Sequence, residues 1–112
     1  TVSLADQMLG LAREFDPTLK LKYNKFYIGL ERDAQPFNFL SFKPKKNFLK
    51  LEIKIPQSAE IDSIIDKAGL DSLEYEKRWG LYRVRLSAED IKTKAATLKE
   101  LAKIAFDIRA GS

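Results

Sequence analysis

The sequence contains no cysteine and no histidine. Without cysteine, a disulfide framework, a thiol nucleophile and a zinc–thiolate site are all excluded. Without histidine, no imidazole is present to act as a general base or to bind a metal. Glycine is scarce as well: the five glycines are scattered, so no glycine-rich loop can cradle a phosphate. We therefore expect no cofactor and no metal site, and we favour a non-catalytic function over an enzymatic one.

Long apolar runs are also missing. A membrane-spanning helix needs about 18 consecutive apolar residues, and no stretch of this sequence approaches that length. The first residues, TVSLAD, lack the basic start and the apolar segment of a secretory signal peptide. We therefore expect no membrane partner, and the absence of cysteine favours a cytoplasmic location.

What is present is an ordinary globular composition. Of the 112 residues, 45% are hydrophobic and 32% are charged. This length is typical of one domain, and a chain of this size buries roughly 65% of its unfolded surface. We expect residues 1–112 to form a single domain with one core. Because the first residue is threonine rather than methionine, we also expect a fragment of a longer polypeptide.

Three segments carry apolar residues at helical spacing. A serine stands at the start of each segment, where its hydroxyl can accept a hydrogen bond from a free backbone N–H group. A glycine follows the second segment and is a natural helix stop. The predicted helices cover residues 4–15, 58–69 and 87–109, with Ser3, Ser58 and Ser87 as N-caps and Gly69 as the stop.

Elsewhere the repeat of apolar residues shortens from 3.6 residues to two residues, which predicts strands. The pattern is clearest after Phe48, where leucine and isoleucine alternate with lysine and glutamate, so that one face is apolar and the other charged. Short turns join successive strands and force neighbours to be antiparallel. The alternation begins at residues 19–23. A three-stranded meander is predicted at residues 26–31, 37–43 and 48–55, and a further strand at 81–86. Residues 73–77 are compatible with a short edge strand.

The apolar face of such a sheet must be covered, and three one-sided helices supply the cover. We therefore predict an α+β fold in which an antiparallel sheet of four to five strands has three helices packed mainly on one face. The opposite face of the sheet is expected to be at least partly open to solvent.

Charge is distributed unevenly, although the net charge is only +4. Residues 20–54 hold nine Lys or Arg against three Asp or Glu, and residues 77–112 hold nine against four. Residues 55–76, between them, hold one Lys against six acidic residues. Each basic segment contains predicted strands, so the cations of both would share one surface if those strands are neighbours.

Cations gathered on an open sheet face would attract phosphate groups. Exposed aromatic side chains beside them could stack on single-stranded bases, which is worth about 1–3 kcal/mol per base. A merely solvated face is the alternative, because lysine commonly solubilises exposed strands and protects sheet edges. The predicted nucleic-acid-binding residues are Lys43, Lys45, Lys46, Lys50, Arg83 and Arg85, and the predicted residues for base stacking or partner contact are Trp79 and Tyr82, with Tyr23 and Tyr27 as further stacking candidates.

Trp79-Gly80 is the most singular pair in the sequence, because it holds the only tryptophan. One interpretation is a platform on which a ligand stacks. The other, which we favour on general grounds, is a tryptophan that plugs one end of the core while the glycine supplies a tight turn.

One pattern is compatible with a magnesium-dependent nuclease. Glu52-Ile53-Lys54 is an acid-x-lysine motif on a strand, and Asp33 lies in a preceding turn. In such nucleases two acids hold the metal and the lysine positions water or steadies the developing phosphate charge. A solvated strand face has the same appearance, and aspartate is favoured in turns for backbone reasons.

From residue 37 onward the chain resembles a small bacterial domain of unknown function. The matching features are Asn38-Phe39, Pro44-Lys45-Lys46 before Leu49-Lys50-Leu51, Trp79-Gly80, and Arg83-Val84-Arg85-Leu86-Ser87 before a closing helix. That domain ends many proteins described as predicted transport proteins and some restriction or phage-defence proteins. The family tends to have histidine at the position of Arg78 and a second glycine near Leu81-Tyr82. The resemblance implies a C-terminal accessory module, attached to a nuclease-like or unassigned region, with no known catalytic residue.

Three functions therefore remain open. The leading hypothesis is a non-catalytic accessory module that binds nucleic acid through a basic open sheet face. The second is a protein–protein or homodimerisation module, whose partner could be another domain of the parent protein, with Trp79 as the anchor. The third is the magnesium-dependent nuclease that uses Glu52 and Lys54.

Overall fold

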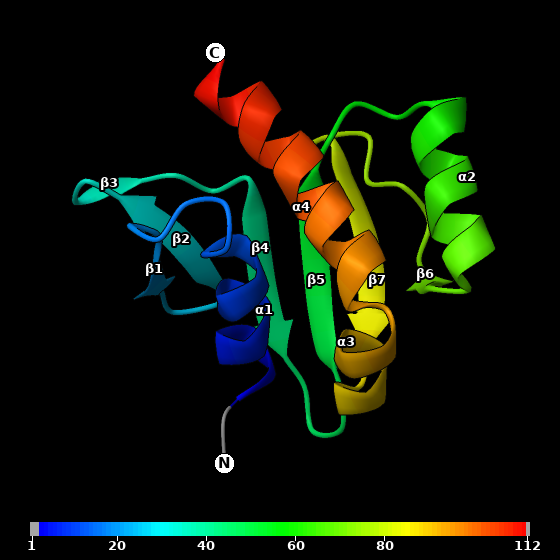
Figure 1. Ribbon diagram of the computed structural model, residues 1–112, viewed down its shortest axis with the longest axis horizontal. Helices are drawn as coiled ribbons and strands as arrows, with labels where there is room; N and C mark the ends of the chain where they lie inside the picture. Colours follow the sequence, from blue (N-terminus) through cyan, green and yellow to red (C-terminus); the bar gives the residue numbers. More distant parts are fainter. Residues whose placement is uncertain (1–2, 112) are drawn as a thin grey trace.

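The computed structural model describes residues 3–111. Within them, seven strands form one antiparallel sheet with the order β1-β2-β4-β5-β7-β6, and β3 pairs with β2. The helices lie in front of this sheet in Figure 1. The elements are α1 (Leu4–Ala12), β1 (Lys20–Tyr23), β2 (Ile28–Arg32), β3 (Gln35–Pro36), β4 (Leu40–Pro44), β5 (Leu49–Lys54), α2 (Ala59–Ala68), β6 (Asp71–Ser72), β7 (Leu81–Leu86), α3 (Ala88–Thr93) and α4 (Ala95–Ala110).

The predicted α+β class and the antiparallel sheet are confirmed, whereas the predicted numbers of elements were too low. Strands β3 and β6 have only two residues each, which is too short for an alternating pattern to be visible. The edge strand expected at 73–77 lies instead at Asp71–Ser72, and Glu76 forms only an isolated bridge with Leu81. The single closing helix is divided at Lys94, whose φ of −116° and ψ of 23° are not helical.

The helix ends follow the local chemistry that predicted them. The hydroxyl of Ser58 accepts a hydrogen bond from the Ile61 N–H group, and Ser87 forms a reciprocal capping box with Asp90. Gly69 closes α2 in the left-handed conformation, with φ of 67°. The first helix is shorter than predicted, because α1 ends at Ala12 and the chain continues in turns as far as Phe15.

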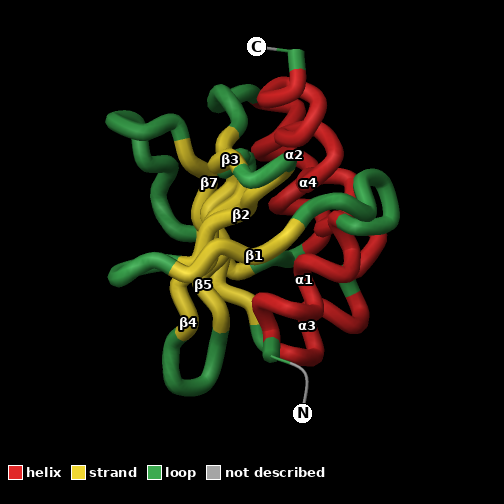
Figure 2. Tube along the Cα trace, turned by 90° about the vertical axis from the view of Figure 1, so that its left-hand side faces the viewer, coloured by secondary structure: helices red, strands yellow, loops and turns green. Residues whose placement is uncertain are grey.

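The helices and the sheet form two layers, as Figure 2 shows with the helices to the right of the strands. The core lies between these layers and combines the inward side chains of the strands with one stripe from each helix. Strand β5 follows the expected alternation, because Leu49, Leu51 and Ile53 are almost completely buried. No helix within residues 3–111 has the length and apolar character needed to cross a bilayer.

The join between β2 and β4 is narrow. Only one residue pair, Ile28 with Phe42, is in register between them. Beyond that pair, the Asn38 side-chain oxygen accepts a hydrogen bond of 2.8 Å from the Leu30 N–H group. A Cβ atom at Gly29 would collide with this Asn38 side chain, so glycine is needed there.

A tight turn joins β2 to β3. Arg32 pairs with Gln35, and the two residues between them, Asp33 and Ala34, have positive φ angles of 54° and 62°. Two positive φ angles are typical of a type I′ hairpin turn, which favours glycine at the second position. Alanine therefore holds a strained backbone conformation at this tip.

Candidate functional site

The sheet face opposite the helices carries cations from three adjacent strands. In the register of the sheet, Lys43 on β4 stands opposite Lys50 on β5, which stands opposite Arg85 on β7. The next row contains Ser41, Glu52 and Arg83 in the same order. Segments far apart in the sequence thus place their positive charges side by side. We use "basic face" for Lys43, Lys50, Arg83 and Arg85 together with Lys45 and Lys46 of the β4–β5 hairpin.

One carboxylate lies among these cations. Glu52 is only 6% exposed, although the strand pattern predicted that it points into solvent. It accepts a hydrogen bond of 3.2 Å from the Ser41 hydroxyl and pairs with the Lys43 ammonium group at 3.5 Å. The prediction of a solvated Glu52 was therefore wrong, because the side chain is buried where it contacts Ser41 and Lys43 on the neighbouring strand. Glu52 offsets part of the positive charge of the basic face but not all of it.

The two arginines of the basic face are held by neighbouring chain segments. Arg83 donates two hydrogen bonds, of 3.1 and 2.6 Å, to the Glu74 carbonyl oxygen, and it forms no ion pair with any residue in the range 3–111. Arg85 forms an ion pair with Asp71 at 3.4 Å, and both side chains are substantially exposed. Exposed pairs of this kind contribute about 0–1 kcal/mol, so a phosphate can compete for Arg85.

Lys50 is partly buried, and its pKa is affected by the charged side chains around it. Burial lowers the pKa of its ammonium group; Glu52 acts in the opposite direction, and Lys43, Arg83 and Lys45 lower the pKa further by repulsion. A bound anion would relieve this repulsion. Burial and the neighbouring cations thus both disfavour the charge of Lys50, and Glu52 offsets part of this effect.

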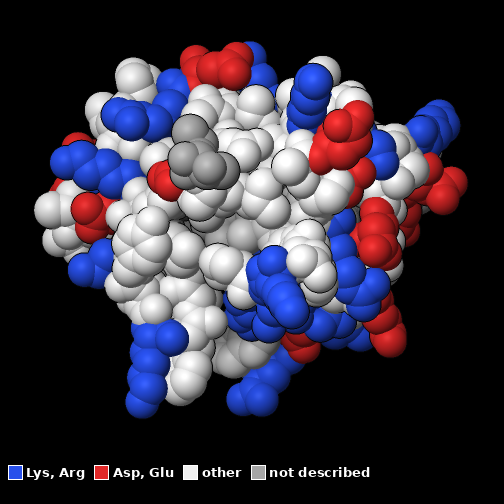
Figure 3. All heavy atoms as spheres, turned by 90° about the horizontal axis from the view of Figure 1, so that it is seen from below, with Lys and Arg blue, Asp and Glu red and all other residues white. Residues whose placement is uncertain are grey.

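The β4–β5 hairpin carries the most accessible cations of the basic face. Lys45 and Lys46 are exposed, and within residues 3–111 neither side chain has a hydrogen bond or an ion pair. Figure 3 views the molecule from the end that carries this hairpin and shows Lys and Arg side chains gathered below and to the right of the centre. These two lysines are free to meet a ligand without breaking a contact inside the chain.

Tyr82 does not lie on the basic face. It is 6% exposed, and its hydroxyl donates a hydrogen bond of 2.7 Å to Asp62 on α2. The prediction that Tyr82 contacts bases or a partner is thus corrected. The physical reason is the strand period of two, which turns Tyr82 to the same side as Val84 and Leu86.

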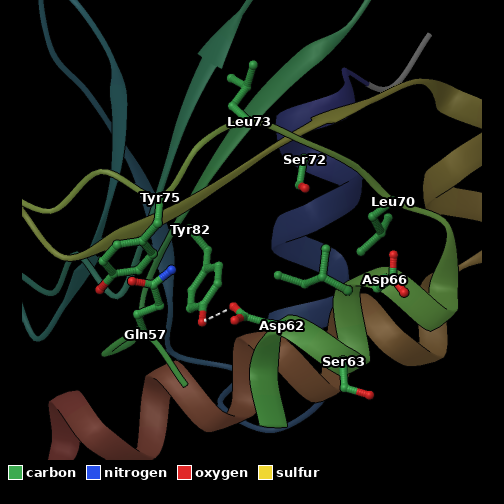
Figure 4. A pocket seen from close by; sticks show the side chains of 10 residues that line it. Gln57, Asp62, Ser63, Asp66, Leu70, Ser72, Leu73, Tyr75 and Tyr82 are labelled. Carbon is green, nitrogen blue, oxygen red and sulfur yellow. Dashed lines mark hydrogen bonds between the residues drawn. The ribbon is translucent and has the colours of Figure 1, made fainter. Parts of the chain in front are cut away.

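The surroundings of Tyr82 are acidic rather than basic. Its ring packs edge-on against Tyr75, with 4.7 Å between centroids, at the wall of a cavity of about 570 Å³. Figure 4 shows Asp62 and Asp66 of α2 at this cavity, with Tyr82 pointing to Asp62. Much of the acidic segment 55–76 is thereby placed at α2, away from the hairpin lysines.

Trp79 is exposed, so its interpretation as a plug of the core was wrong. Its side chain is 59% exposed, and the Arg78 guanidinium lies over the ring at 5.0 Å. The Lys54 ammonium group donates a hydrogen bond to the Trp79 carbonyl oxygen, which ties the turn to β5. Gly80, with φ of 70°, supplies the tight turn that was expected.

A second exposed ring was missed by the sequence pattern. Phe26 is 79% exposed and has the Lys25 ammonium group 5.3 Å from its centroid. The alternation with Ile28 and Leu30 placed it in the core, but β2 begins only at Ile28, so the strand period does not apply to Phe26. The preceding Asn24-Lys25 pair, which is typical of a turn, was the signal that it lies in a loop.

Three loops extend beyond the strands. In Figure 2 the β1–β2 loop, which contains Phe26, and the segment 73–80, which contains Trp79, project to the left of the strands, on the side away from the helices. The β4–β5 hairpin, which contains Lys45 and Lys46, extends downward from the ends of β4 and β5. The β1–β2 loop and the segment 73–80 therefore border the basic face, and each carries one exposed aromatic residue.

The residues of the nuclease pattern are not brought together. Asp33 lies at the tip of the β2–β3 turn, whereas Glu52 lies on β5, and β4 stands between β2 and β5 in the sheet. Glu52 is engaged by Ser41 and Lys43, and Lys54 by the Trp79 carbonyl oxygen. Over residues 3–111, no three acidic side chains are grouped closely enough to hold a metal ion.

Comparison of the chain with models of protein families, with curated proteins and with solved structures finds no match. The resemblance to the bacterial domain that ends predicted transport and defence proteins therefore stays a prediction.

Proposed function

We propose that this chain is a non-catalytic module that binds nucleic acid through the basic face. The observation that carries the proposal is the register of β4, β5 and β7, which aligns Lys43, Lys50 and Arg85 in one row across the sheet. Together with Arg83, Lys45 and Lys46, this row places six cations against two paired carboxylates, Glu52 and Asp71, and such an excess of positive charge matches the repeated negative charge of a phosphate backbone.

The cations differ in how readily they can take part. Lys45, Lys46 and Lys50 have no ion pair within residues 3–111, and Arg83 is bonded only to a carbonyl oxygen. Lys43 and Arg85 would have to share a phosphate with Glu52 and Asp71. About four phosphate contacts predict that the logarithm of the affinity falls with the logarithm of the salt concentration with a slope of roughly −3 to −4.

The module is accessory in this proposal. Its resemblance to a C-terminal bacterial domain supports a place beside a nuclease-like or otherwise unassigned region of a cytoplasmic protein. The fold would then supply attachment to the polymer, and any chemistry would reside in the rest of the parent protein.

The test measures binding of fluorescent oligonucleotides by anisotropy at several salt concentrations. The double variant Lys45→Glu/Lys46→Glu should weaken binding at least ten-fold and reduce the salt slope by about 1.4–1.8. The matched control is Lys67→Glu/Lys92→Glu, which makes the same change in net charge on α2 and α3. Equal affinity and equal slope in both double variants would refute the proposal, because net charge alone would then explain the binding.

A protein partner or a second copy of the chain is the alternative that Trp79 and Phe26 favour, since exposed aromatic side chains often anchor protein interfaces. Sedimentation at two protein concentrations separates the two functions. A monomer at both concentrations that binds oligonucleotide supports the nucleic-acid module. A concentration-dependent dimer that is lost in Trp79→Ala and does not bind oligonucleotide supports the interaction module instead.

A further inference from the structure

We infer that the basic face selects single-stranded over double-stranded nucleic acid, with Phe26 and Trp79 as two separate platforms for unstacked bases. This inference rests on the proposed function, and it concerns which form of the polymer is bound. Its starting point is that the loops that carry both exposed rings border the basic face and that neither ring belongs to the core.

Each ring is accompanied by its own cation. Lys25 lies 5.3 Å from the Phe26 centroid, and Arg78 lies 5.0 Å from the Trp79 ring. A base that stacks on either ring brings its flanking phosphate close to that cation. Aromatic–cation pairs beside a positively charged groove are the combination by which single strands are bound without sequence preference.

The two rings lie at diagonal corners of the basic face. Phe26 precedes β2, and Trp79 precedes β7, with β4 and β5 between these strands. Because β2 runs parallel to β5 and β7 runs antiparallel to it, the loops that precede β2 and β7 lie toward opposite ends of their strands. From ordinary strand spacing and rise, the two loops are separated by roughly 25 Å.

This separation sets the length of strand that can touch both rings. At about 3.4 Å per stacked nucleotide, 25 Å corresponds to roughly seven nucleotides, and fewer when the strand is extended. The row of Lys43, Lys50 and Arg85 crosses β4, β5 and β7 between the two rings and would hold the phosphates of the intervening nucleotides. A strand too short to span the face can use only one ring.

A duplex cannot use either platform, because its bases already stack on one another inside the helix. The β1–β2 loop and the segment 73–80, which project on this side of the sheet, also hinder a wide, stiff duplex from reaching Lys50 on the sheet itself. A duplex is therefore limited to the hairpin lysines, whereas a flexible single strand can enter between the loops. The expected preference for single strands arises from both effects.

The experiment uses oligothymidylates of four and twelve nucleotides and a twelve-base-pair duplex. Wild type should bind the twelve-nucleotide strand more tightly than the duplex and much more tightly than the four-nucleotide strand. Phe26→Ala and Trp79→Ala should each weaken binding of the long strand about five-fold to a hundred-fold and leave duplex binding unchanged. Because both rings are exposed, thermal melting should show that these variants stay folded.

Ile108→Ala is the control. Ile108 is also a large, exposed apolar side chain, but it lies on α4, in the helix layer on the other side of the sheet from the basic face. Its removal should leave the ratio of single-strand to duplex affinity unchanged. The single tryptophan gives a direct second readout: the fluorescence of Trp79 should be quenched by the long single strand and not by the duplex.

The outcomes separate the inference from the function on which it rests. The single-strand preference is overturned if single strand and duplex bind equally, without quenching and without an effect of Phe26→Ala or Trp79→Ala. The proposal that the basic face binds nucleic acid would then still hold. Binding of neither form overturns both. Weakened single-strand binding in Ile108→Ala as large as in Phe26→Ala also overturns the inference, because loss of any exposed apolar side chain would then be equivalent.

Discussion

The two sides of strand β5 can be compared directly, because they share one backbone and one set of ladder hydrogen bonds. On the helix side, Leu49, Leu51 and Ile53 are almost completely buried in the core. On the other side, Lys50 and Lys54 reach solvent, and only Glu52 is buried, under neighbouring cations. The choice of residues on the helix side is thus determined by packing, whereas the choice on the far side is determined by the balance of charge.

This difference teaches where the sequence is free to vary. An apolar residue on the helix side contributes both hydrophobic transfer and close packing, so its loss destabilises the fold. A lysine on the far side contributes little to folding, because its head group is hydrated in the folded and the unfolded chain alike. The residues of the basic face can therefore be set by function with little loss of stability.

The largest effect should come from Leu51→Ala. Leu51 is 1% exposed between the sheet and the helices, and removal of a buried leucine costs about 2–5 kcal/mol in unfolding free energy. Its neighbour on the other side gives the contrast: Lys50→Ala should change stability by less than about 0.5 kcal/mol. Urea denaturation of both variants measures the comparison, and equal losses would show that the two sides do not differ as described.

A smaller effect is expected at Glu52, which is buried although it lies on the charged side of β5. Glu52→Gln keeps the size of the side chain but removes the only carboxylate buried among Lys43, Lys50 and Arg83. Stability should fall by roughly 1–2 kcal/mol, since the repulsion between these cations is no longer offset. Affinity for an oligonucleotide should rise at the same time. Parallel loss of stability and affinity would instead assign Glu52 a role in the binding surface.

Disruption of the capping box of α3 should change stability by a comparable or slightly smaller amount, and this change should depend on pH. A hydrogen bond from the Ser87 N–H group lowers the pKa of Asp90; burial opposes this, and the Lys94 ammonium group lowers it further. Because the folded pKa lies below the unfolded value of about 3.9, this contribution is complete above about pH 5 and is lost as the pH falls through the folded pKa.

Asp90→Asn should therefore lower stability at pH 7 by about 0.5–2 kcal/mol and reduce the loss of stability between pH 5 and pH 2. Thermal melting across this range measures both. The idea fails if the variant and the wild type lose stability in parallel on acidification.

The smallest effect should be a gain. Ala34 occupies the second positive-φ position of the β2–β3 turn, where glycine is favoured. Ala34→Gly should raise the unfolding free energy by up to about 1 kcal/mol, since relief of the left-handed strain exceeds the added entropy of the unfolded chain. Lowered stability in urea would mean that the tip is not strained.

Much of the fold could be predicted because its determinants are local. The alternation from Leu49 to Ile55 specifies a strand with one apolar side, and the serines before α2 and α3 specify helix starts. Strands β3 and β6 could not be predicted in this way. They exist because a turn or a loop brings two residues alongside an established strand, which is a tertiary event without a periodic signature.

The candidate site shows the same division. The outward direction of Arg83 and Arg85 followed from the strand period, and the same period, applied to Tyr82, would have placed that ring in the core. The partners of the arginines could not be foreseen, because Asp71 and Glu74 reach β7 only through the path of the segment after α2. Exposure of Phe26 depends on where β2 begins, and the first residue of a strand is poorly specified by sequence.

The narrow join between β2 and β4 also affects where the domain opens locally. One register pair, the Asn38 side chain and a backbone hydrogen bond of 2.9 Å from the Phe37 N–H group to the Leu30 carbonyl oxygen join β2 to β4 and the segment before it, whereas β5 and β7 are in register over their full lengths. Amide protons of β1 and β2 should accordingly exchange with deuterium sooner than those of β5, as one cooperative unit. Since Phe26 belongs to that unit and Trp79 does not, local opening would alter the spacing of the two rings without unfolding the domain's centre.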